Sequence, residues 1–378
     1  MSRLSVSTSA SELDPEQWED LARRIQPNVF LHPAALKAVH DAGFAKVLTL
    51  LAYDESVTPR RLVGVWAFQI KTLLPLIAAL LVAPAYDYAF LSCPLIDPAL
   101  RSEVIEAFFA AIAKQGRLPK VLRLSYLDGG NETYAAILKA LGNGRKGLTL
   151  AARERPIAFK DCGMKRSGST RKKLRQDWNR LSALGTVEIV NDRDPERVSE
   201  AFEVFLAMEA ASWKGANGTA LLSKAKDAAF TRRLIGDLAA AGSASVAAMR
   251  LNGRPIACQV LLYSGTTAYT WKTAFDSEFA HYSPGSVLVD RITEQLFASG
   301  AIESIEACSP EGGFMTRLFT GRRPTVDLLV KLDDKPSFSF ALAALADIAR
   351  RQAKRWRDAV RSWAQHSRLK PPAAQPTH

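Results

Sequence analysis

Two stretches in the second half of the chain place a carboxylate, amines and aromatic rings at short spacing. Glu209 precedes the segment Trp213-Lys214-Gly215, and Lys272 precedes Asp276 by four residues. Acyl transfer from a thioester to an amine needs a base for the ammonium proton and a donor for the developing oxyanion. Glu209 lies nearest the Trp-Lys-Gly segment and is the leading candidate for the base. The alternative is an exposed carboxylate in the last turn of a helix.

Three further side chains could take part in such chemistry. Lys272 either holds substrate or forms a structural pair with Asp276. His281 is an acid or base if it faces the site, and otherwise a surface histidine. Tyr282 either donates a proton to the leaving thiolate or packs in the core.

A Pro-Gly segment in front of a predicted helix could hold the phosphates of a cofactor. The start of a helix offers unpaired N–H groups and the positive end of its dipole. Gly285 would let the backbone approach a pyrophosphate, although an ordinary strand–helix connection explains the same residues. The residues assigned to this cofactor site are Ser283, Pro284, Gly285, Ser286 and Val287. Basic residues upstream could bind its phosphates or an anionic acceptor, namely Arg171, Lys172, Lys173 and Arg175.

Alternating helical and strand patterns predict the elements that position these residues. The second half is expected to have helices at 170–184, 195–212, 227–240 and 286–298, a hairpin at 244–251 and 256–263, and strands at 186–190, 267–275, 303–307 and 325–331. The first half is expected to have helices at 13–25, 97–113 and 132–141 and strands at 45–53, 61–71 and 120–126. Residues 145–156 are expected to connect the halves, and the apolar stretch 73–84 is a buried strand or loop, or a lip that touches acyl chains.

Composition limits the class of protein. A chain of 378 residues with 48% hydrophobic residues can bury two cores. The four cysteines lack metal or redox spacing, so we expect no metal site and no disulfide framework. Without a signal peptide or an apolar run of about 20 residues, a cytoplasmic protein is expected. The net charge of +12 is concentrated in residues 160–180 and 345–370, which suggests an anionic cofactor, lipid or nucleic acid, or else solvated helix faces.

The order of motifs in the second half resembles a known family. Glu209, Trp213-Lys214-Gly215, Ala257, the run 269–276 and Tyr282-Ser283-Pro284-Gly285 look like the acetyltransferase domain of the CelD/BcsL group of the GNAT superfamily. That group is similar to FemABX-type proteins, which carry two tandem GNAT domains. The resemblance covers 160–330 well and reaches parts of the first half, at 29–33 and 83–97.

The resemblance implies an α/β (α+β) fold of two tandem GNAT-like domains with mixed central sheets flanked by helices. We expect a non-catalytic first domain at 1–150, a catalytic domain at 155–335, a basic amphipathic helix at 338–366 and a disordered tail at 367–378. The family has a lysine in the segment that here reads 314–321, where Arg317 stands in its place. The residues expected to bind substrate are Trp213, Lys214, Trp271, Asp276 and Arg317.

Three functions fit these features. The first is an acyl-CoA-dependent N-acyltransferase with no permanently bound cofactor, acting on an amine of a cell-envelope precursor such as an amino sugar, a polysaccharide or a lipid long-chain base. The second is a FemABX-like transferase that uses aminoacyl-tRNA. The third is a non-catalytic module that binds membrane or nucleic acid. Residues 338–363 alternate apolar and basic side chains at helical spacing, which suits a helix on an anionic membrane or one packed on the body.

Overall fold

The computed structural model describes residues 3–8, 14–25, 28–75, 77–142, 144–309 and 312–368. The first half contains β1 (Leu4–Ser7), α1 (Pro15–Arg24), η2 (Val29–Leu31), α2 (Pro33–Asp41), β2 (Val47–Asp54), β3 (Arg61–Leu74), β4 (Ala78–Ala83), β5 (Leu95–Ile96), η3 (Pro98–Leu100), α3 (Arg101–Lys114), β6 (Val121–Asp128), α4 (Glu132–Ala140) and β7 (Lys146–Phe159). Of the disordered tail expected at 367–378, residues 367–368 belong to α11 and residues 369–378 lie outside the described residues. Leu13, where the first helix was expected to begin, also lies outside them.

The second half continues with helices and strands in a similar order. Its elements are α5 (Ser169–Ser182), β8 (Val187–Val190), α6 (Pro195–Ala210), α7 (Trp213–Ala216), η4 (Leu221–Ser223), α8 (Ala225–Ala240), β9 (Ala244–Leu251), β10 (Arg254–Ser264), β11 (Thr267–Phe275), η5 (Ser277–Tyr282), α9 (Pro284–Ala298), β12 (Ser304–Ala307), α10 (Phe314–Leu318), β13 (Gly321–Lys331) and α11 (Phe338–Arg368). Every element expected from the sequence is present within a few residues of its predicted bounds.

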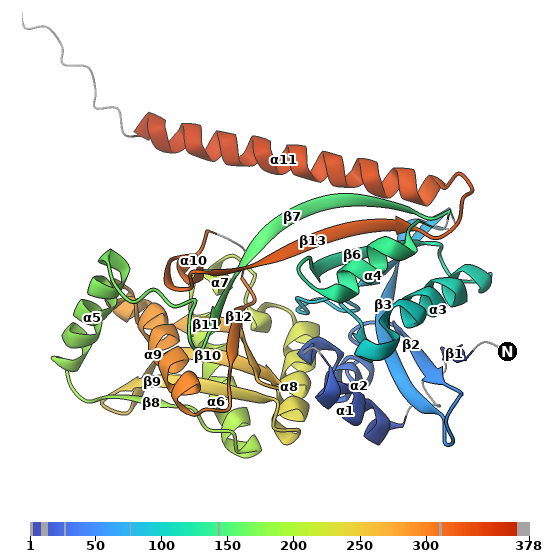
Figure 1. Cartoon of the computed structure of the whole chain (residues 1–378). Coiled ribbons are helices and arrows are strands. Elements are labelled where there is room, and N and C mark those ends of the chain that lie inside the picture. The colour runs from blue at the N-terminus through green and yellow to red at the C-terminus, as the bar shows by residue number, and fades with distance from the viewer. Residues whose placement is uncertain are drawn as a thin grey trace, which may run out of the picture.

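One continuous mixed sheet runs through the described part of the chain, with helices on its faces (Figure 1). Its strand order is β1-β2-β3-β4-β6-β13-β7-β12-β11-β10-β9-β8. In each half, three antiparallel strands lead to a parallel pair, β4 with β6 and β11 with β12. The predicted architecture of two similar α/β units is therefore confirmed.

The two units exchange their last strands. β6 of the first half pairs with β13 at the end of the chain, while β12 pairs with β7 from the first half. β7 and β13 also pair with each other along their lengths and join the units (Figure 1). The predicted boundary at 150–155 falls within β7, and the domain bounds stay a prediction.

Residues 145–156 are not the connection that we expected but most of strand β7. The charged residues that suggested a linker have partners in the sheet. Arg153 pairs with Asp327 at 2.6 Å, and Arg155 pairs with the buried Glu306 at 2.7 Å. The apolar stretch 73–84 likewise forms the end of β3 and the strand β4, and Ile77 in the turn between them is 68% exposed.

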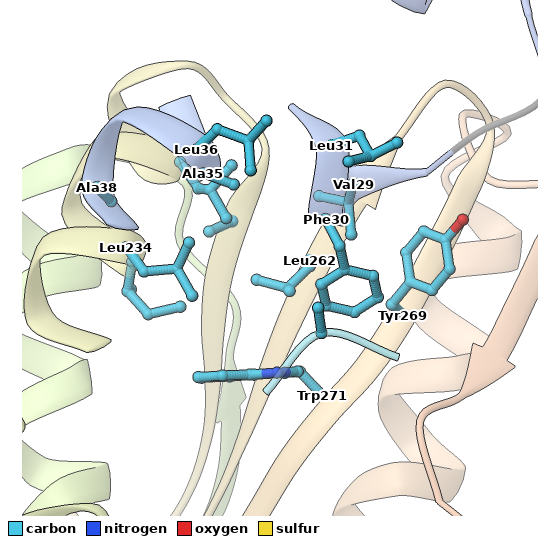
Figure 2. Packing of buried hydrophobic residues seen from close by; sticks show 14 of the residues in the cluster. Val29, Phe30, Leu31, Ala35, Leu36, Ala38, Leu234, Leu262, Tyr269 and Trp271 are labelled. Atoms are coloured by element: carbon cyan, nitrogen blue, oxygen red, sulfur yellow. The ribbon is translucent and has the colours of Figure 1, made fainter. Parts of the chain in front are cut away.

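The largest core cluster lies between the units. Figure 2 shows residues of η2 and α2 against α8, β10 and β11, with Phe30 beside Tyr269. The ring centres of Phe30 and Tyr269 are 5.9 Å apart in an edge-to-face arrangement. The first helices of the chain thus cover the same sheet face of the second unit on which α6 and α8 pack.

Candidate active site between two faces of β11

Glu209 is the centre of a buried ion cluster at the end of α6. Its side chain has no exposed surface, and Lys214 Nζ donates to Oε1 at 2.9 Å. The backbone N–H of Leu221 donates to Oε2 at 2.9 Å. A buried carboxylate needs this kind of compensation, since desolvation of an unpaired charge costs several kcal/mol. Glu209 is therefore held firmly, with both oxygens in use.

The Trp-Lys-Gly segment turns the chain so that Lys214 reaches this carboxylate. The segment forms the short helix α7, capped by the Ser212 hydroxyl. A Cβ atom on Gly215 would lie 1.8 Å from the Ala210 carbonyl oxygen, so only glycine fits there. Trp213, expected to bind substrate, is 64% exposed beside the cluster.

Lys272 lies on β11 next to the same carboxylate. Its Nζ is 3.9 Å from Glu209 Oε1, and its side chain is 16% exposed. Burial lowers the pKa of Lys272; the charge of Glu209 raises that pKa, and the charge of Lys214 lowers it. The expected pairing with Asp276 is wrong, because Asp276 pairs with Arg254 instead. Lys272 is thus a partly buried amine whose pKa lies below the usual lysine value.

In the described part of the chain, no strand pairs with β11 beyond Thr270 on the side of β12, and this open edge is where Lys272 lies. β12 pairs with β11 only as far as Thr270, whereas β11 continues to Phe275. A bulge leaves Trp271 without a partner on β10. As a result, Lys272 faces α6 and α8, while the next residue, Thr273, lies against the start of α9. The open edge therefore connects the ion cluster on one face of the sheet with the N-terminus of α9 on the other.

A cavity of about 250 Å³ lies at the start of α9. It is lined by Ser283 and Ser286 of the expected cofactor segment, by Arg317 of α10 and by one face of α5. The other members of that segment do not line it, because Pro284, Gly285 and Val287 are buried. A Cβ atom on Gly285 would lie 3.2 Å from Phe275 and 3.4 Å from Thr273. Gly285 thus permits close packing of α9 on β11, which differs from the expected contact with phosphates.

The basic residues of α5 fall into two groups. Arg171 is bound to α9 through Asp290 and through Glu294 at 2.7 Å. Lys172 and Arg175 are exposed and line a groove of about 580 Å³ beside the cavity. Of the residues assigned to phosphate binding, Lys172 and Arg175 therefore keep their charges open to an anion.

His281 and Tyr282 lie apart from the ion cluster, at the end of η5. His281 is exposed, and its ring centre is 3.8 Å from that of Tyr282. Tyr282 is half-buried and packs against the core of the second unit. In the described part of the chain, no group of three His, Cys, Asp or Glu side chains could hold a metal ion.

Two residues near Lys272 could not be found from the sequence. The Lys272 Nζ lies 5.1 Å from the ring centre of Tyr88, which belongs to the first unit. The Tyr88 hydroxyl donates to Asp227 on α8 at 2.6 Å. Nothing in the local sequence around Tyr88 marks it, because the contact spans more than 130 residues.

A comparison of the sequence with protein-family models decides the domain type. Residues 168–309 match the acetyltransferase (GNAT) domain. The matched residues make up most of the second unit, which is therefore similar to a GNAT acetyltransferase domain. The open edge of β11, the cavity at α9 and the Lys272 cluster all lie within or beside the matched residues. No curated protein matches the chain by sequence.

Solved structures share the fold of the whole GNAT-containing chain. The C-terminal domain of a putative lysylphosphatidylglycerol synthetase from Agrobacterium fabrum superposes with a TM-score of 0.57 at 16% identity, covering 90% of this chain and 96% of that domain. FemX gives a TM-score of 0.57 at 9% identity, with 89% and 98% covered. L-PGS from Bacillus licheniformis gives 0.52 at 13% identity, with 88% and 96% covered. These superpositions confirm the predicted GNAT and FemABX-like architecture. The match of residues 168–309 to the acetyltransferase domain supports N-acyltransferase activity in general.

Proposed function

We propose that this protein is an acyl-CoA-dependent N-acyltransferase whose active site is the open edge of β11. The observation that carries the proposal is that the edge of β11 beyond Thr270 has the amine of Lys272 next to Glu209 on one face and the start of α9 against Thr273 on the other. A pantetheine chain can follow the free edge of β11 by main-chain hydrogen bonds, as a further strand would. The nucleotide would lie at the cavity and the basic groove, and the thioester would reach Lys272.

Lys272 acts as the general base in this mechanism. The neutral amine of Lys272 takes a proton from the acceptor ammonium, and the freed amine attacks the thioester carbonyl. An N–C bond forms and the C–S bond breaks. The Lys272 ammonium returns its proton to the departing thiolate, and the second proton lost by the attacking nitrogen passes to water. Glu209 acts on this proton through Lys272, because its oxygens are already bonded and it has no exposed surface. In this proposal Lys272 therefore takes the role of base that the sequence analysis gave to Glu209.

The acceptor is an amine on a cell-envelope precursor, and an amphiphilic long-chain base is the candidate that α11 favours. The first turns of α11 pack on the sheet through Phe340, Ala343 and Asp347, and Arg351 donates to the Leu150 carbonyl. The opposite face carries exposed apolar side chains, namely Phe338, Leu345, Ile348, Trp356 and Val360. Exposed basic residues flank this stripe, namely Arg350, Lys354, Arg355 and Arg357.

An apolar stripe between basic flanks fits the surface of an anionic membrane. The helix runs along the sheet and continues beyond the body (Figure 1). Arg361 and Trp363, also assigned to this surface, have side chains outside the described residues. In the described part of the chain, no helix is long and apolar enough to cross a membrane. One of the similar structures is, by name, the C-terminal domain of a putative lysylphosphatidylglycerol synthetase.

The experiment that tests the function combines the purified protein, acyl-CoA and an amine library. Release of free CoA thiol that depends on the amine, with an amide product found by mass spectrometry, supports the proposal. The exposed basic surface of α5 favours one second candidate, a transferase that uses aminoacyl-tRNA. Transfer from aminoacyl-tRNA with no CoA release would support that candidate and overturn the first.

A further inference from the structure

The segment between β4 and β5 leaves the first unit and enters the core shared with the second. Tyr86 donates its hydroxyl to the Phe30 carbonyl at 3.0 Å, and its ring packs edge-on against Phe230 of α8. Two residues further, Tyr88 turns toward the end of β11. The segment is thus anchored on both sides of Tyr88, because Phe90 in turn packs against Phe30.

Tyr88 is fixed by three contacts from three elements. The indole N–H of Trp271 donates to the Tyr88 carbonyl at 2.9 Å, and the Tyr88 hydroxyl donates to Asp227 at 2.6 Å. The ring of Phe44 lies 6.1 Å from the Tyr88 ring. The backbone of Tyr88 has φ of 76°, a left-handed conformation that is costly for an aromatic residue. Such strain persists only where surrounding contacts impose it, and it is concentrated at functional sites.

These contacts place the face of the Tyr88 ring on Lys272. The Lys272 Nζ lies 5.1 Å from the ring centre, within the range of a cation–π interaction, and 3.9 Å from Glu209 Oε1. The amine is therefore held between a carboxylate of the second unit and an aromatic face of the first. The other charged groups near it are Lys214 on α7 and Asp227 on α8.

We propose that Tyr88 is a positioning residue through which the first unit completes the active site of the second. It acts on the reaction through Lys272, by fixing the amine at the open edge of β11. The ring also stabilises the charged form of that amine, which makes the contact measurable by titration. The first unit then contributes to catalysis by positioning Lys272, although it supplies no reacting group. The inference rests on the proposed function, in which Lys272 is the base.

The test compares three variants of the full-length protein. Tyr88→Leu removes the ring but keeps an apolar side chain, and we expect kcat to fall roughly 10- to 100-fold, since small displacements of reacting groups cost that much. KM for the acyl donor should change little. Tyr88→Phe keeps the ring, loses only the bond to Asp227, and should retain most of kcat. Tyr86→Phe is the matched control, because it loses a buried hydroxyl of the same segment that does not contact Lys272.

A second readout does not depend on acyl transfer. The pKa of the Lys272 amine is measured by the pH dependence of its labelling with acetic anhydride, read on the Lys272 peptide by mass spectrometry. Without the aromatic ring the charged form loses a partner, so Tyr88→Leu should label at lower pH than wild type, while Tyr88→Phe and Tyr86→Phe should not. If Tyr88→Leu labels like wild type and loses no more kcat than Tyr86→Phe, the inference is wrong. If the labelling shift occurs without any acyl transfer, the proposed function fails but the placement of Lys272 by Tyr88 stands.

Discussion

The charges of Glu209 and Lys214 shift the pKa of Lys272 in opposite directions, which gives a pair of predictions for these residues. A base must lose its proton to act, so kcat should rise with pH through the pKa of Lys272, which burial holds below the usual lysine value. Glu209→Gln removes a charge that raises this pKa, and the rising limb should move to lower pH. Lys214→Met removes a charge that lowers it, and the limb should move to higher pH.

The measurement is kcat against pH for both variants, with Glu203→Gln on the exposed side of α6 as the control. Lys272→Met should lower kcat roughly 10²–10⁴-fold, the usual cost of losing a general base. If Glu209→Gln abolishes the rising limb while Lys272→Met preserves it, Glu209 is the direct base. The carboxylate would then have to leave its present bonds to reach substrate.

The sequence identified several residues of the candidate site, but it did not predict which side chains they contact. Glu209 and Lys214 are five residues apart, so their association follows from a turn that Gly215 alone permits. A structural pair of Lys272 with Asp276 was one of two alternatives, the other being that Lys272 holds substrate. Asp276 instead pairs with Arg254. The bulge at Trp271 interrupts the alternation of faces along β11, and sequence periodicity does not reveal a bulge. Tyr88 was missed because its contacts are long-range.

The start of α9 gives a prediction at the scale of an element. Ser286 lies in the first turn of α9, half-buried on the wall of the cavity. Ser286→Asp places a negative charge where the helix dipole and Arg317 would otherwise attract phosphates. We expect the Kd for CoA to rise roughly tenfold or more, measured by calorimetry. Ser286→Ala is the control and should bind CoA nearly as wild type does; equal affinity for the Asp variant would place the nucleotide elsewhere.

The exchanged strands give a second prediction at this scale. Glu306 on β12 is fully buried and accepts from Arg155 on β7 and from Arg323 on β13, each at 2.7 Å. Glu306→Ala would leave two guanidinium groups without their partner in the joint between the units. Breaking a buried ion pair in this way costs about 3–5 kcal/mol of unfolding free energy. Denaturant unfolding measures the change, and Glu200→Ala on the exposed side of α6 should cost little.

The individual elements were predictable, but the pairing of β7 and β13 was not. Hydrophobic periodicity identifies a strand and its buried face, and it carries no information on which distant strand lies alongside. Arg153 and Arg155 made β7 look like a solvated linker in the sequence. Their carboxylate partners lie on β13 and β12, far away in the chain, so the sequence did not reveal them. The alternation of strands and helices was enough to identify the α/β class and the two similar units.

At the scale of the whole molecule, α11 packs on the sheet and has a proposed membrane contact, and truncation can separate the two. Its first turns cover a small core of the sheet that includes Leu80, Leu329 and Ala343. Removal of residues 338–378 should expose this core and lower the melting temperature. Removal of 353–378 keeps the contacts of Asp347 and Arg351 and should leave the melting temperature nearly unchanged.

The shorter truncation tests the proposed membrane contact separately from the packing of α11. It removes Trp356, Val360 and the basic residues beyond Gln352, so binding to vesicles that contain phosphatidylglycerol should be lost while activity on a water-soluble amine is kept. Each basic residue near an anionic surface contributes about 1 kcal/mol. Binding of the full chain should also weaken as salt rises, because the attraction is screened over about 8 Å at physiological ionic strength. If the full-length protein does not bind these vesicles at low salt, the exposed stripe of α11 does not contact a membrane. The proposal of a lipid acceptor would then lose its main support.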